Sequence, residues 1–365
     1  MKRRLNFILG ILISAIFVYL AFRRVRIVEI YYSLKHANYL LILPNMAFVI
    51  LTLIMRAERW RYLLRPLDSF KATQLFPSVM IGFMANNLLP ARLGEVVRAY
   101  SLGAKSGQSR SSIFASIVLE RVFDSLSLLT MFWLVILFIP FPPAVKKFGY
   151  ITLGVNVAII ALLVLLKQKT AFLTRIAVLV FSFLPARLTE TAESIITKFA
   201  NGLNVIKNPG TLMSIALWSA VIWIVTALSN YFVFMAFGLR PNVAASFILL
   251  LFVAAGVMLP SAPGFVGVFQ AATIGAFATL NELNLLGSQM TWLKAKAAAL
   301  TAPVFGGGSI AAIGPMADSM GLFGISKGEA LSFSIVLWLC QYLPVTLLGL
   351  YYLRREHFSL RTVGT

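Results

Sequence analysis

The chain has very little of the material from which metal centres and disulfides are built. Its 365 residues include one cysteine, Cys340, and two histidines, His36 and His357. A single cysteine excludes an intrachain disulfide and a multi-cysteine metal site, and two histidines cannot form a histidine-rich centre. We therefore expect no disulfide, no metal and no cofactor.

Charged residues are also scarce. Asp, Glu, Lys and Arg make up 12% of the chain, against about a quarter in soluble proteins. The sequence lacks a histidine pair for metal binding, a nucleophile elbow and a phosphate-binding glycine loop. We assign no catalytic residue, although a membrane transferase that uses Glu95 or Asp124 as its base stays open.

Long apolar runs take the place of the missing charge. The chain is 59% hydrophobic with a mean hydropathy of +0.88, and runs of bilayer-spanning length, about 20 residues, recur. We predict an all-α polytopic membrane protein, one integral domain over residues 1–365. It would have about seven to eight transmembrane helices plus two re-entrant or broken helices in two pseudo-repeated halves. The expected spans are 5–22, 39–55, 113–139, 148–166, 211–237, 243–259 and 330–353.

The formal net charge is +20, and the basic residues lie beside the apolar runs. This position favours contact with anionic lipid over nucleic acid. Segments expected inside hold 21 Lys and Arg residues, and those outside hold 7. The bias predicts a multi-pass protein of the cell inner (plasma) membrane with both termini cytoplasmic. Residues 170–208 alternate apolar and charged positions at helical intervals, so we expect cytoplasmic amphipathic helices there.

Two polar breaks rich in glycine and proline interrupt the apolar pattern, at 86–98 and 260–270. Backbone broken at membrane depth is tolerated only where protein or a wet cavity satisfies it. Broken segments at matching places in two halves point to the binding site of a transporter. We therefore expect re-entrant segments at 74–102 and 258–280.

The first break carries charge. Three-residue steps place Arg92, Glu95 and Arg98 on one helix face, just after the polar pair Asn86 and Asn87. A helix that begins inside the break would direct its positive dipole end and two arginines at an anion, for which a lipid phosphate is a natural guest. Alternatively, both arginines are topology residues paired with Glu95.

A second charged group lies inside the span 113–139. Glu120 and Asp124 share a helix face, and Arg121 adjoins Glu120. Ionisable residues in a span must face protein or water and pair with partners such as Arg92 or Arg98. An ion-pair latch between helices and a direct substrate or proton role both remain open.

Arginines also flank Trp60 at the end of the second span. Arg56 and Arg59 share a face there. An aromatic residue with flanking arginines is typical of an interfacial anchor. Contact of either arginine with a lipid headgroup is the alternative.

The second break has no formal charge. Gly264 and Gly267 allow close backbone approach, while Ser261 and Gln270 offer neutral hydrogen bonds. A helix kink in a tightly packed bundle is the alternative. Together, the two breaks and the charged span supply the predicted substrate-binding set. Its members are Asn86, Asn87, Arg92, Glu95, Arg98, Glu120, Arg121, Asp124, Ser261, Gly264, Gly267 and Gln270.

The run 86–98 followed by Glu120-Arg121-x-x-Asp124 resembles the flippase-like transmembrane domain of lysylphosphatidylglycerol synthases, and the run 260–269 resembles the second signature of that family. The resemblance implies an integral membrane protein whose two broken segments are re-entrant helices lining a lipid path. The best understood members carry a cytosolic aminoacyl-transferase domain and move aminoacylated phosphatidylglycerol between leaflets.

The chain also departs from that family. We identify no aminoacyl-transferase domain in these 365 residues, so we do not expect a lysyltransferase role. Gln270 stands where the family usually has a glutamate, and Cys340-Gln341 stands where an arginine is common. Residues 278–320 resemble an insertion, to which we assign no function.

The sequence thus predicts a lipid translocase. It would move an anionic or modified phospholipid, or a polyprenyl-phosphate-linked lipid, between leaflets. The alternative is a membrane enzyme or accessory subunit of lipid or envelope-glycan biosynthesis. Membrane lipids are the expected partners, nucleic acid is not, and a homo-oligomer or a biosynthetic partner enzyme is left open.

Overall fold

The computed structural model describes most of the chain, and every regular element within the described part is a helix. This confirms the all-α fold. The described residues are 12, 14–22, 25, 27–89, 92–138, 143–168, 197–198, 208–239, 241–259, 261–283, 285–286 and 325–358. The predicted amphipathic helices at 170–208 lie almost entirely outside this part.

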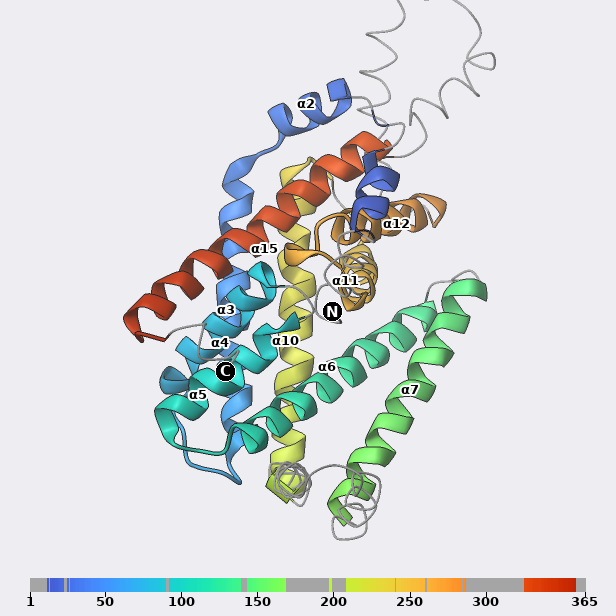
Figure 1. Ribbon diagram of the computed structural model, residues 1–365. Helices are drawn as coiled ribbons and strands as arrows, with labels where there is room; N and C mark the ends of the chain where they lie inside the picture. The colour runs from blue at the N-terminus through green and yellow to red at the C-terminus, as the bar shows by residue number, and fades with distance from the viewer. Residues whose placement is uncertain are drawn as a thin grey trace, which may run out of the picture. The chain divides into compact units, whose positions relative to one another are not determined.

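Among the described helices, two sets share the same order of lengths (Figure 1). Their bounds are α2 Ile27–His36, η1 Tyr39–Leu41, α3 Ile42–Leu64, α4 Ala72–Leu88, α5 Gly94–Ser106, α6 Arg110–Phe138, α7 Pro143–Gln168, α10 Pro209–Ala236, α11 Val243–Met258, η4 Pro263–Phe265, α12 Val268–Glu282 and α15 Lys327–Arg355. The lengths of α3 to α6 are 23, 17, 13 and 29 residues, and those of α10, α11, α12 and α15 are 28, 16, 15 and 29. This long, short, short, long order supports the predicted pseudo-repeat.

Four helical segments in the described part are long and apolar enough to cross a membrane. They are Tyr39–Leu64, Pro209–Ala236, Pro263–Glu282 and Lys327–Arg355, and the shorter apolar helices are Gly149–Leu162 and Val243–Met258. A polytopic membrane protein is therefore confirmed. The total of seven to eight spans stays a prediction.

The first break separates two helices that run antiparallel. The hydroxyls of Ser78 on α4 and Ser101 on α5 lie 3.1 Å apart. Nearer the break, a Cβ at Gly82 would lie 2.7 Å from Cβ of Arg98. At 1.5 Å per residue the two helices are about 25 and 20 Å long, shorter than a hydrocarbon core of about 30 Å. A hairpin of such helices fits the predicted re-entrant segment.

The second break forms a similar hairpin from α11 and α12. A Cβ at Gly256 would lie 2.6 Å from Cβ of Ala272, and one at Gly275 would lie 3.5 Å from the ring of Phe252. These pairs run in opposite directions along the two helices, as in the first hairpin. Each helix is about 23 Å long.

The chain divides into two compact units, and each break lies in a different one. Residues 1–49 and 226–343 form the unit that holds the second hairpin. Its core contains packed phenylalanine rings, with Phe234 and Phe333 at 4.8 Å and Phe277 and Phe333 at 4.9 Å between centroids. Residues 50–225 and 344–365 form the unit that holds the first hairpin.

Two residues near the ends of the segment predicted as an insertion, Asn281 and Ile325, are hydrogen-bonded to each other. The Asn281 side chain accepts from the backbone N–H of Ile325 and donates to its carbonyl, both at 3.2 Å. Helix α12 ends at Glu282 and so continues five residues into the segment assigned to 278–320. Residues 287–324 lie outside the described part.

Candidate functional site

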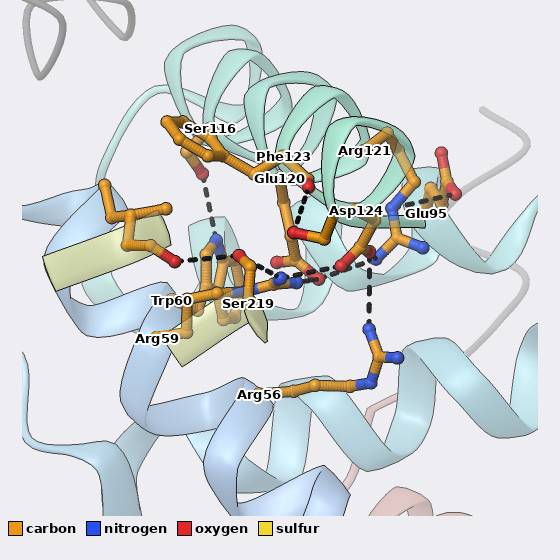
Figure 2. A network of polar contacts seen from close by, with 12 residues as sticks. Arg56, Arg59, Trp60, Glu95, Ser116, Glu120, Arg121, Phe123, Asp124 and Ser219 are labelled. Carbon is orange, nitrogen blue, oxygen red and sulfur yellow. Dashed lines mark hydrogen bonds and ion pairs between the residues drawn. The ribbon is translucent and has the colours of Figure 1, made fainter. Parts of the chain in front are cut away.

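Two carboxylates on α6 form the centre of a buried network of charges (Figure 2). Glu120 is fully buried and Asp124 is 4% exposed. They are four residues apart and therefore share one face of the helix. Arg59 of α3 contacts both: its Nη1 donates to Asp124 Oδ1 at 2.6 Å, and its Nη2 lies 3.1 Å from Glu120 Oε1. The pair thus ties α3 to α6.

Arg98 brings the first hairpin into this network. Its Nη1 donates to Glu120 Oε1 at 3.1 Å, and its Nη2 lies 3.0 Å from Glu120 Oε2. The guanidinium stacks on the Trp60 ring at 3.7 Å, and the indole N–H of Trp60 donates to Ser116 Oγ at 2.9 Å. The charge of Arg98 is therefore engaged by Glu120 and not by Glu95.

Arg56 contacts the Asp124 oxygen that Arg59 does not use. Its Nη1 donates to Asp124 Oδ2 at 3.3 Å, and its guanidinium lies 5.1 Å from the ring of Trp223 and 5.5 Å from that of Phe83. Trp223 also donates to Asp124 Oδ1 at 3.2 Å. Aromatic faces attract a desolvated cation, so Arg56 is held by one carboxylate and two rings.

Arg121 lies at the partly exposed edge of the network. It donates to Glu120 Oε1 at 2.6 Å and lies 3.2 Å from Asp124 Oδ2. Its Nε also lies 3.7 Å from Glu95 Oε1 of the first hairpin. The Arg121 side chain is 33% exposed and that of Glu95 23%. These two side chains are the partly exposed members of the network among the described residues.

The first break is held by side chains that the sequence assigned to substrate. Asn86 Oδ1 accepts from the backbone N–H of Gly94 at 2.9 Å and so caps α5. Asn87 donates to Thr346 Oγ1 of α15 at 3.0 Å. Arg92 has φ 53°, a left-handed conformation that is uncommon outside glycine and clusters at functional sites. Pro90 and Ala91 lie outside the described residues.

The second break is held by a matching amide cap. Gln270 Oε1 accepts from the backbone N–H of Gly267 at 2.7 Å, at the start of α12. Gly264 and Gly267 have φ 73° and 86°, and the Trp338 indole donates to the Gly264 carbonyl at 2.7 Å. Ser261 lies beside them, partly exposed. These residues shape the turn.

The structure thus brings together six of the predicted residues with Arg56 and Arg59, which sequence reasoning treated chiefly as an interfacial anchor. Glu95, Arg98, Glu120, Arg121 and Asp124 take part in ion pairs, and Arg92 lies in the adjoining break. The signal for Arg56 and Arg59 was their shared face beside Trp60. Within the described part of the chain, no cluster of His, Cys, Asp and Glu could hold a metal.

Comparison with known proteins gives a family and several relatives. A model of the lysylphosphatidylglycerol synthase TM region matches residues 7–284. The chain is 25% identical over 300 residues to the glycosyltransferase AglD of Haloferax volcanii. The aligned region covers 74% of this chain and 48% of AglD. It is 23% identical over 323 residues to a UPF0104 membrane protein of Pyrococcus horikoshii, covering 80% and 92%.

A UPF0104 membrane protein of Methanocaldococcus jannaschii is 26% identical over 225 residues, covering 55% of this chain and 86% of the relative. The chain therefore spans about half the length of AglD but most of the length of these two UPF0104 proteins. No solved structure matches.

Proposed function

The chain belongs to the lysylphosphatidylglycerol synthase TM region family, and from this premise we propose that it moves a lipid with a phosphate-bearing headgroup between the leaflets of a membrane. The observation that carries the proposal is the charged network on α3, α5 and α6. Ionisable groups are expensive inside a bilayer and mark substrate pathways by default. This network joins a long apolar helix, α6, to a hairpin of short helices.

The headgroup would meet the network at its exposed edge. Arg121 offers a planar guanidinium there, which suits bidentate contact with a phosphate. Arg92 lies in the adjoining break. The first turn of α5 directs the positive end of the helix dipole toward this break. Arg98 is engaged by Glu120, so the proposal gives it a positioning role, holding α5 against α6. The acyl chains would stay in the bilayer.

A flipping assay tests the proposal. The full chain, reconstituted into phosphatidylglycerol-containing liposomes with a fluorescent phosphatidylglycerol, should expose inner-leaflet label to dithionite faster than empty liposomes do. Arg121→Ala should slow this exposure at least about tenfold, because one bidentate phosphate contact is lost. Arg354→Ala, at an exposed arginine of α15 outside the network, is the matched control. A rate equal to that of empty liposomes across several headgroups would refute the function.

A second candidate is presentation of a lipid to a transferase in lipid or envelope-glycan biosynthesis. It is favoured by the similarity to a glycosyltransferase of which the match covers 48%. The network would then hold the lipid carrier for a reaction carried out elsewhere. Product formed from a lipid phosphate and an activated sugar donor by a separate transferase, and only when the purified chain is added, would place this candidate first.

The proposal includes an orientation with both termini on the cytoplasmic side of the plasma membrane. The bias of 21 against 7 basic residues supports it. Cys340 is 4% exposed, so Cys340→Ser gives a cysteine-free chain in which Arg354→Cys supplies one reporter near the C-terminus. A membrane-impermeant maleimide should label this reporter only after cells are permeabilised. Labelling of intact cells would reverse the orientation.

A further inference from the structure

The network contains more positive than negative charge. Within the network, the ion pairs of the described residues join four arginines to three carboxylates, an excess of one positive charge. The arginines are Arg56, Arg59, Arg98 and Arg121, and the carboxylates are Glu95, Glu120 and Asp124.

The network also has more buried donor atoms than buried acceptor atoms without a hydrogen bond. The buried Nε–H groups of Arg59, Arg98 and Arg121 have no hydrogen-bond partner within the described structure. The Nη2 groups of Arg59 and Arg98 lie within ion-pair distance of Glu120 but lack hydrogen-bond alignment. Among the buried acceptor atoms that the described residues bring to the network, Glu120 Oε2 is the one without a hydrogen bond. Surplus donors and surplus positive charge both call for an anionic acceptor.

We propose that this network selects the headgroup by net charge: it admits lipids whose headgroup is a net anion and rejects those whose headgroup carries surplus amines. The inference rests on the proposed lipid translocation and restricts its substrate class. A phosphate supplies acceptor oxygens and neutralises the excess charge. A cationic headgroup supplies more donors and adds like charge in a poorly solvated site, where repulsion is only weakly screened.

The phosphate of the lipid headgroup would compete with the Glu95 carboxylate for Arg121. The contact between Arg121 and Glu95, at 3.7 Å, is the longest ion pair that the described residues form in the network, and both side chains are partly exposed. The other contacts of Arg121 run to Glu120 and Asp124, which are buried. An incoming phosphate can therefore replace Glu95 without disrupting the centre of the network.

A headgroup series with identical acyl chains tests the inference. The full chain in liposomes is given fluorescent phosphatidylglycerol, phosphatidic acid, phosphatidylcholine or lysylphosphatidylglycerol. The two anionic lipids should move at least about tenfold faster than the lysylated one, which corresponds to about 1.4 kcal/mol. Equal or faster movement of the lysylated lipid would overturn the inference while leaving translocation intact. No acceleration of any lipid would instead overturn the proposed function.

Two variants that break the same ion pair separate charge selection from structural support. Glu95→Gln adds one positive charge to the network, and Arg121→Gln removes one. If net charge selects the headgroup, the rate ratio of phosphatidylglycerol to phosphatidylcholine should rise in Glu95→Gln and fall in Arg121→Gln. A shift of this ratio in the same direction in both variants would overturn the inference. Arg92→Gln gives a second loss of charge if Arg121→Gln does not fold.

Inorganic phosphate distinguishes a lipid headgroup from a free ion as the ligand. Added in excess on both sides of the liposome, it should slow the anionic lipids by competition at the network and preserve their order of rates. If it slows all four lipids equally and abolishes the headgroup preference, the site binds free phosphate and the inference is overturned.

Discussion

The two hairpins share an architecture and differ in charge. Each consists of two short antiparallel helices, and in each an amide side chain caps the second helix, Asn86 in the first and Gln270 in the second. The first contributes Glu95 and Arg98 to the ion-pair network. In the second, residues 243–281 contain no Asp, Glu, Lys or Arg. One backbone design thus supports a charged site in one unit and an uncharged turn in the other.

From this difference in charge we infer that the first hairpin is the one that contacts the proposed lipid substrate. A buried ion pair is weak evidence for stability, because desolvation offsets most of its Coulomb attraction. Its presence in the first hairpin therefore needs a reason other than packing, and the proposed contact with a lipid headgroup would supply one. The second hairpin gains its close packing from glycines and apolar residues, which need no such reason. Experiments that act on both hairpins can test this assignment.

The largest expected effect comes from removing a buried carboxylate beside the first hairpin. Glu120→Ala leaves Arg59 and Arg98 without their shared partner, and breaking a buried pair in this way destabilises by about 3–5 kcal/mol. Unfolding of the purified protein in mixed micelles measures the change. Glu356→Ala removes the partner of Lys105 in a more exposed pair and should cost less than about 1 kcal/mol. Equal losses would show that the network is solvated.

Sequence reasoning identified this region for a physical reason. Glu120 and Asp124 occur in an otherwise apolar run, where an ionisable group must find a partner, and Arg98 was named as one. Arg59 was missed as part of the centre because an arginine at the end of an apolar run also suits an interfacial anchor. Its contact with Asp124 spans 65 residues of chain, a long-range packing that no local pattern encodes.

The same limit applies to the breaks. The pattern of glycine, proline and polar residues predicted both breaks, and the observed helix bounds fit a hairpin at each break. The amides Asn86 and Gln270 were assigned to substrate because their type and location suit hydrogen bonding. The structure directs both to backbone N–H groups at a helix start. Which donor an amide finds depends on how the turn closes, and that geometry lies beyond a single sequence.

The next largest effect tests the close approach that the two hairpins share. In Gly94→Ala the new Cβ would lie 2.6 Å from the backbone nitrogen of Asn86, and in Gly256→Ala it would lie 2.6 Å from Cβ of Ala272. Overpacking of this kind costs about 1–3 kcal/mol, and both variants should lose stability in the micelle assay.

Gly154→Ala in α7 is the control for this pair, because nothing lies within 4 Å of its Cβ. It should be neutral or stabilising by up to about 1 kcal/mol, since alanine restricts the unfolded chain. If Gly94→Ala matched this control, the crossing of α4 and α5 would be looser than the structure indicates.

The smallest effect on stability is the most informative about function. Asn86→Ala and Gln270→Ala each remove one hydrogen bond to a backbone N–H at a helix start, and the loss of such a bond costs about 0.5–1.5 kcal/mol. The two variants should therefore lose similar stability. Their effects on lipid movement should differ, because α5 carries Glu95 and Arg98 into the network whereas α12 contributes no charged side chain before Glu282. Asn86→Ala should slow phosphatidylglycerol flipping several-fold more than Gln270→Ala does. If Gln270→Ala slowed it equally at equal stability, the uncharged hairpin would line the lipid path as directly as the charged one.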